Sequence, residues 1–133
     1  MPYVIGIVLA VGVALFARYV GLDRDRAFYP TVVIVVALYY VLFAAMSGSV
    51  QTVFLESAIM MVFAIAAVVG FKSSPWIVAA ALAGHGVFDA FHGYVLENPG
   101  VPVWWPAFCG AYDLGAAAIL AWLVQRRPRG LLE

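Results

Sequence analysis

The sequence predicts an all-α integral membrane bundle of five transmembrane helices, forming a single domain over residues 1–133. Hydrophobic residues make up 66% of the chain and charged residues 11%, whereas soluble domains carry roughly 25% charged residues. The mean hydropathy is +1.03. Five apolar runs are each long enough for a helix that crosses the hydrocarbon core, which takes about 20 residues. We therefore expect a multi-pass protein of the cell membrane.

The expected spans are separated by short segments that favour turns. The spans are approximately 3–20, 28–47, 51–71, 76–96 and 106–125. A charged loop at 23–26 follows the first run, a Ser-Gly-Ser turn at 47–49 follows the second, and Lys-Ser-Ser-Pro at 72–75 follows the third. Segment 97–106 holds three prolines and a glycine, so we expect a loop there. No basic residue precedes the first run, which we expect to be retained as a span rather than cleaved as a signal peptide.

The basic residues predict how the bundle is oriented. All seven lie at or beyond the ends of the apolar runs: Arg18, Arg24, Arg26, Lys72, Arg126, Arg127 and Arg129. With five spans these residues all fall on one side of the membrane, whereas four spans would divide them. Basic residues favour the cytoplasmic side. The sequence therefore predicts an external N-terminus and a cytoplasmic C-terminus.

Ionisable side chains within the apolar runs form the candidate site. These residues are Glu56, His85, Asp89, His92 and Asp113. An ionisable group in hydrocarbon costs several kcal/mol and usually marks a functional site. At about 1.5 Å per helical residue, all five lie about 7 to 17 Å below the outer ends of their spans, in one layer. Since no lysine or arginine lies inside a run, protons, the imidazoles or a bound cation must neutralise the acids.

The spacing of these residues is typical of helical metal sites. His85, Asp89 and His92 share one helical stripe, and a carboxylate three residues before a histidine binds metals in helix bundles. Cys109 precedes Asp113 by one turn, and Tyr39 and Tyr40 reach a similar depth. The predicted metal ligands are Glu56, His85, Asp89, His92 and Asp113, and the candidate ions are zinc, iron and manganese. The chain has no HExxH or CxxC motif.

The predicted function is that of a metal-dependent enzyme, such as a hydrolase, that acts on a lipid or another apolar substrate. A metal-activated water would attack an ester or amide, with catalytic roles assigned to Glu56, His85, Asp89 and Asp113. One alternative is a metal-free, isomerase-like enzyme that uses the same groups as general acid and base. Others are a protein that transports or binds protons or metal ions, or hydrogen-bonded struts between helices. Transport is disfavoured because segments 60–69 and 116–124 are wholly apolar.

The composition also limits the partners of the chain. Membrane lipids and a lipid or apolar substrate are the expected partners, and a homo-oligomer is compatible with the sequence. The formal net charge is zero, and the basic residues lie in short loops rather than in a patch, so no nucleic-acid partner is expected. Cys109 is the single cysteine, which excludes a disulfide within the chain.

Overall fold

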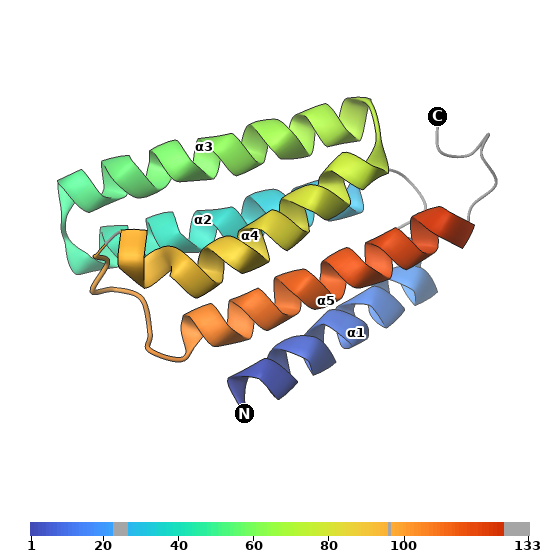
Figure 1. The fold of residues 1–133 in the computed structure, drawn as a ribbon, viewed down its shortest axis with the longest axis horizontal. Helices are drawn as coiled ribbons and strands as arrows, with labels where there is room; N and C mark the ends of the chain where they lie inside the picture. The colour runs from blue at the N-terminus through green and yellow to red at the C-terminus, as the bar shows by residue number, and fades with distance from the viewer. Residues whose placement is uncertain (23–26, 96, 127–133) are drawn as a thin grey trace.

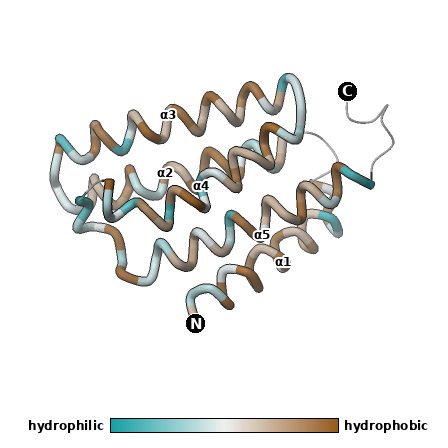
Figure 2. Tube along the Cα trace, viewed as in Figure 1, coloured by the Kyte–Doolittle hydropathy of each residue, from teal (hydrophilic) through white to brown (hydrophobic). Residues whose placement is uncertain are grey.

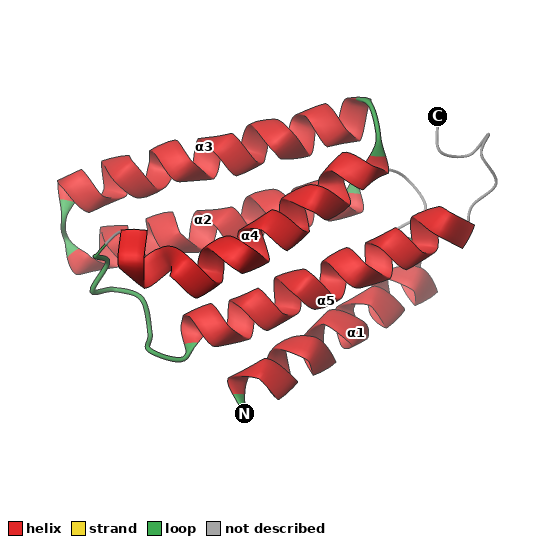
Figure 3. Ribbon diagram, viewed as in Figure 1, coloured by secondary structure: helices red, strands yellow, loops and turns green. Residues whose placement is uncertain are grey.

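The described part of the chain is entirely helical in its regular structure. A computed structural model describes residues 1–22, 27–95 and 97–126, and these residues form five helices and no strand (Figure 3). The helices are α1 (Pro2–Val20), α2 (Phe28–Ser47), α3 (Val50–Lys72), α4 (Pro75–Val95) and α5 (Trp105–Arg126). Their bounds agree with the predicted runs to within one residue. The predicted loop at 23–26 and the basic residues at 127 and 129 lie outside the described residues.

The ends of the helices follow local chemistry. α1 and α2 end at Gly21 and Gly48, whose φ angles of 93° and 82° are left-handed and favour glycine. α3 begins after Ser49, whose side chain accepts a hydrogen bond from the backbone N–H of Thr52. The predicted loop at 97–106 was two residues too long, because α5 already includes Trp105 and Pro106. Proline is tolerated in a first helical turn, where its missing N–H would have no partner.

Successive helices run in opposite directions, so that α1, α3 and α5 end at the same end of the bundle (Figure 1). Lys72 and Arg126 lie at that end, in the last turns of α3 and α5. α4 packs against α5, α3 and α2, and α1 packs on α5. A methyl group at Gly6 would overlap the backbone carbonyl of Phe108, so glycine permits the close approach of α1 to α5.

Four of the helices are long and apolar enough to cross a membrane: α1, α2, α3 and α5. α4 is long enough, but His85, Asp89 and His92 make it less apolar than the other four. Hydrophobic residues cover most of the helical trace, and the C-terminal end of α5 is hydrophilic (Figure 2). The four apolar helices indicate a membrane protein.

The apolar core occupies the half of the bundle where α3 ends and α4 begins. Val33, Ala67 and Leu82 are fully buried there, together with Leu120 and Val124 of α5. The ionisable residues of α4 follow this core along the helix, because they come after Leu82. The interior is therefore divided lengthwise into an apolar half and a polar half.

Candidate functional site

The five predicted site residues are all buried, at most 3% exposed. α3 supplies Glu56, α4 supplies His85, Asp89 and His92, and α5 supplies Asp113. The carboxylates are paired with histidines rather than with lysine or arginine. Burying a charge without a partner is very costly, so the fold needs these contacts with histidine to bury the three carboxylates.

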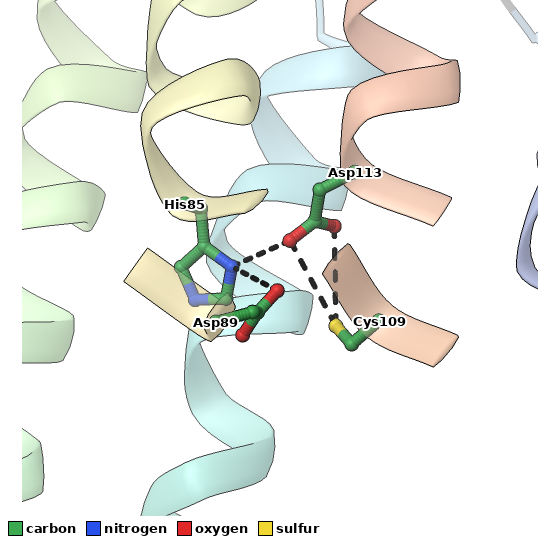
Figure 4. A group of neighbouring side chains, drawn as sticks. All are labelled: His85, Asp89, Cys109 and Asp113. Carbon is green, nitrogen blue, oxygen red and sulfur yellow. Dashed lines mark hydrogen bonds and ion pairs between the residues drawn. The ribbon is translucent and has the colours of Figure 1, made fainter. Parts of the chain in front are cut away.

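A first group of side chains lies between α4 and α5 and is called here the α4–α5 cluster: His85, Asp89, Cys109 and Asp113 (Figure 4). Nδ1 of His85 is 2.6 Å from Oδ2 of Asp113 and 3.5 Å from Oδ2 of Asp89. The Cys109 thiol lies 3.8 Å and 3.9 Å from the two carboxylate oxygens of Asp113. One potential ligand atom from each of the four residues lies within 4.8 Å of the others. This buried group could hold a metal ion.

Two glycines bring α4 and α5 together at this cluster. A methyl group at Gly86 would lie 2.9 Å from Leu114 and 3.2 Å from the backbone oxygen of Gly110. A methyl group at Gly110 would lie 3.5 Å from Cβ of Asp89. Glycine at both positions lets the two backbones approach closely. The carboxylates of α4 and α5 can then reach the same imidazole.

A second group links α3, α4 and the loop that follows α4, and is called here the Glu56–His92 pair. Oε2 of Glu56 is 2.6 Å from Nε2 of His92. The side-chain amide of Asn98 donates to the same Glu56 oxygen at 2.7 Å and to the backbone oxygen of Tyr40 at 3.0 Å. Asn98 thus closes the loop over the pair and joins it to α2.

Tyr40 of α2 connects the two groups. Its hydroxyl donates to Oδ1 of Asp89 at 2.6 Å. Its ring is stacked on the imidazole of His92, with centroids 3.9 Å apart and planes inclined by 9°. Tyr40 therefore lies between the α4–α5 cluster and the Glu56–His92 pair and contacts both.

The predicted metal ligands thus fall into two groups in the structure. His85, Asp89 and Asp113 lie together, whereas Glu56 and His92 contact each other. A ligand role for Glu56 and His92 stays a prediction, as do the predicted catalytic roles. Cys109 joins the first group, although the sequence suggested it merely by its place one turn before Asp113.

Sequence reasoning underrated Tyr40 and missed Asn98. The depth of Tyr39 and Tyr40 in the second span predicted a phenol near the site, without indicating which of the two supplies it. Tyr40 donates a hydrogen bond to Asp89, whereas the ring of Tyr39 stacks on Phe43. Asn98 gave a weaker signal, as one amide in a loop rich in proline. Its contact with Glu56 depends on how that loop folds back over α2, which the sequence pattern does not determine.

Two carboxylate oxygens have unused hydrogen-bonding capacity. Oε1 of Glu56 and Oδ2 of Asp89 are buried and accept no hydrogen bond from the described residues. A buried acceptor without a donor costs about 1 to 3 kcal/mol. Oδ2 of Asp89 also belongs to the α4–α5 cluster, 3.5 Å from His85. A cation or a proton at the cluster would satisfy it.

The spacing of the α4–α5 cluster is close to that of a tetrahedral zinc site. Around zinc, nitrogen and oxygen ligands lie about 3.3 Å apart, and sulfur and oxygen ligands lie about 3.5 Å apart. The distance from His85 to Asp89 is 3.5 Å, and that from Cys109 to Asp113 is 3.8 Å. The contact of His85 with Asp113, at 2.6 Å, would have to open. Two of these spacings are therefore close to those around zinc, and all four potential ligand atoms lie within 4.8 Å of one another.

Comparisons of the chain with models of protein families, with curated proteins and with solved structures found no match.

Proposed function

We propose that this protein is a metal-dependent enzyme of the cell membrane that acts on a lipid or another apolar substrate. The observation that carries the proposal is the α4–α5 cluster, in which an imidazole, two carboxylates and a thiol are buried together. This donor set suits zinc, and without the thiol it also suits iron or manganese.

The charge of the cluster supports a divalent cation. Asp89 and Asp113 together carry two negative charges when ionised, and His85 can supply at most one positive charge. Leaving a net charge in a protein interior is costly. A divalent cation would balance both carboxylates while the imidazole remained neutral, which is the form that ligates metals. With His85, Asp89 and Asp113 as ligands and Cys109 left as a neutral thiol, a bound zinc would keep a fourth position open and would supply an activated water for hydrolysis.

All five helices are proposed to cross the membrane, including α4. The ionisable side chains of α4 point into the bundle, where they are buried, whereas Val87 and Phe91 are among its exposed side chains. A lipid would therefore meet an apolar surface even on this helix. Ionisable residues that face the interior of a bundle are the usual arrangement within membranes.

The proposed topology has the N-terminus outside and the C-terminus in the cytoplasm. A reporter fused at the C-terminus is expected to be cytoplasmic, and one fused at Met1 external, because α1, α3 and α5 end together at the end that carries Lys72 and Arg126. Accessibility of the two tags in intact cells measures this. If both tags were on one side, the five-span topology would be wrong.

The apolar half of the interior favours a pocket over a transport path. Beneath the cluster, the described members of the core around Val33, Leu82 and Leu120 include one polar side chain, Tyr29, and no carboxylate, histidine, lysine or arginine. An ion or proton on its way through one subunit would have to cross that half without a charged ligand. We therefore propose that the site catalyses a reaction of its substrate and does not conduct an ion across the membrane.

Metal analysis of the purified protein tests the proposal. We expect about one divalent metal per chain in the wild type and loss of most of it in Asp113→Asn, because the amide removes both a charge and a ligand. Glu97→Gln is the matched control, since Glu97 is exposed and lies outside the cluster. Metal in equal amounts in wild type and Asp113→Asn would place the ion elsewhere.

The second candidate is a metal-free enzyme that uses acid–base chemistry. It is favoured by the hydrogen bond of 2.6 Å between His85 and Asp113, because a carboxylate in direct contact fixes the tautomer and orientation of the imidazole. A histidine held by one carboxylate can take and return a proton on an apolar substrate, as an isomerase requires. Absence of metal from active wild-type protein, together with loss of activity in Asp113→Asn, would select this candidate.

A further inference from the structure

An apolar groove of about 800 Å³ lies between α1, α2 and α5. Its described lining includes Ile5, Leu9, Val35, Tyr39, Trp105 and Cys109, and no charged side chain. The volume is within the range of about 300 to 1,000 Å³ that small-molecule sites occupy. The hydroxyl of Thr31, also in the lining, already donates to the backbone oxygen of Ala27. The groove therefore suits a hydrocarbon.

The groove opens sideways, toward the surroundings of the bundle. α1 packs on α5, whereas α2 packs mainly on α3. Side chains from both walls remain substantially exposed: Ile5 is 55% exposed and Val35 is 43% exposed. In a membrane, such an opening faces the lipid chains.

The dimensions of the groove match one acyl chain of a single leaflet. The lining runs from Pro2 to Val13 along α1 and from Phe28 to Tyr39 along α2, which is about 16 Å at the rise of a helix. One leaflet of the hydrocarbon core is about 15 Å thick. One acyl chain that spans a leaflet therefore matches the length of the groove and fits its volume.

Polar atoms occur where the groove approaches the α4–α5 cluster. Cys109 lines the groove and its thiol contacts Asp113. Trp105, one turn earlier on α5, also lines the groove, and its Nε1 is buried without an acceptor in the described part of the chain. If the indole turned toward the groove, an ester carbonyl at this level would give its N–H the missing acceptor. Tryptophan is common at this depth, near the membrane interface.

We infer that the groove binds one acyl chain of a membrane phospholipid, with the ester carbonyl at Trp105 and the chain extended between α1 and α2. The inference rests on the proposed function, because it gives that enzyme its substrate class and places the scissile ester next to Cys109 and the metal-binding cluster. Binding in the groove is nonetheless independent of the metal, since Asp113 lies outside the lining.

Photolabelling in vesicles tests the inference. The protein is reconstituted in phosphatidylcholine that contains a phosphatidylcholine with a diazirine on one acyl chain, and labelled peptides are mapped after illumination. We expect residues 31–39 and 105–112 to be labelled well above exposed positions of α3. Uniform labelling of all lipid-facing surfaces would overturn the inference. Labelling of the groove by a diazirine fatty acid but not by the phospholipid would overturn the phospholipid source.

Two matched pairs of variants sharpen the test. Val35→Trp fills the groove, whereas Val62→Trp places the same ring on an exposed part of α3. Trp105→Phe removes the indole donor, whereas Trp122→Phe makes the same change farther along α5, outside the groove. The first member of each pair should reduce labelling of the groove about fivefold, the equivalent of about 1 kcal/mol, and the second should leave it unchanged. Equal effects within both pairs would refute the binding mode.

Two further measurements, the labelling of Asp113→Asn and the oligomeric state, distinguish lipid binding from metal binding and from dimer formation. Asp113→Asn should keep the labelling of the groove even if it loses metal, so failure of the metal proposal and failure of the lipid inference give different results. If Val35→Trp instead converted a dimer to a monomer and left labelling unchanged, the groove would be an interface between copies of this chain. That result would contradict the inference.

Discussion

Zinc should raise the thermal unfolding midpoint of the purified protein by roughly 10 °C when it is present at about 100 times its dissociation constant. The reason is that the α4–α5 cluster exists only in the folded chain, in which α4 and α5 bring His85, Asp113 and Cys109 together. Binding to the folded state alone stabilises it by about 2.7 kcal/mol at that concentration. The unfolding midpoint in detergent, measured with and without metal, is the test.

The same experiment has an internal check on the ligands. Asp113→Asn should lose most of the rise, whereas Glu97→Gln, which changes an exposed carboxylate, should keep it. The rise should also shrink as the pH falls, because protons compete with the metal for the imidazole and the carboxylates. An unfolding midpoint that responded to none of zinc, iron(II) and manganese would contradict a metal site.

The helices could be predicted because the signals that define them are local. Each apolar run is bounded by residues that end or begin helices in the structure, such as Gly21, Gly48 and Pro75. The burial of the ionisable residues was predictable for a similar reason, since hydrocarbon excludes them from the outer surface of a bundle. Both inferences depend on sequence distance and polarity alone.

The division of the site into two groups could not be predicted in this way. Depth along a helix follows from residue number, and it placed all five ionisable residues in one layer. Which neighbour each side chain meets depends on how the helices are rotated and how closely they approach. Gly86 and Gly110 bring α4 against α5 at Asp89, and Tyr40 of α2 occupies the space between Asp89 and His92. Such contacts depend on how two helices pack together, so they cannot be predicted from the sequence of a single apolar run.

Replacing Glu56 with alanine should cost about 3 to 5 kcal/mol of stability, because removal of one partner leaves the other polar groups buried without it. His92 would lose its contact at 2.6 Å, and Asn98 would lose the acceptor that helps to hold the loop on α2 and α3. Glu56→Gln should cost less, since its amide oxygen still accepts hydrogen bonds. Unfolding of both variants by denaturant in detergent measures the difference.

The metal content of the same variants decides whether the two groups act as one site. If the Glu56–His92 pair mainly holds α3, α4 and the loop together, folded Glu56→Gln should retain the metal of the wild type, whereas Asp113→Asn loses it. The contacts favour this outcome, because Glu56 shares its hydrogen-bonded oxygen with His92 and Asn98 and not with the α4–α5 cluster. Loss of metal from folded Glu56→Gln would instead support the single site of five ligands that the sequence predicts, with Oε1 of Glu56 turned toward the ion.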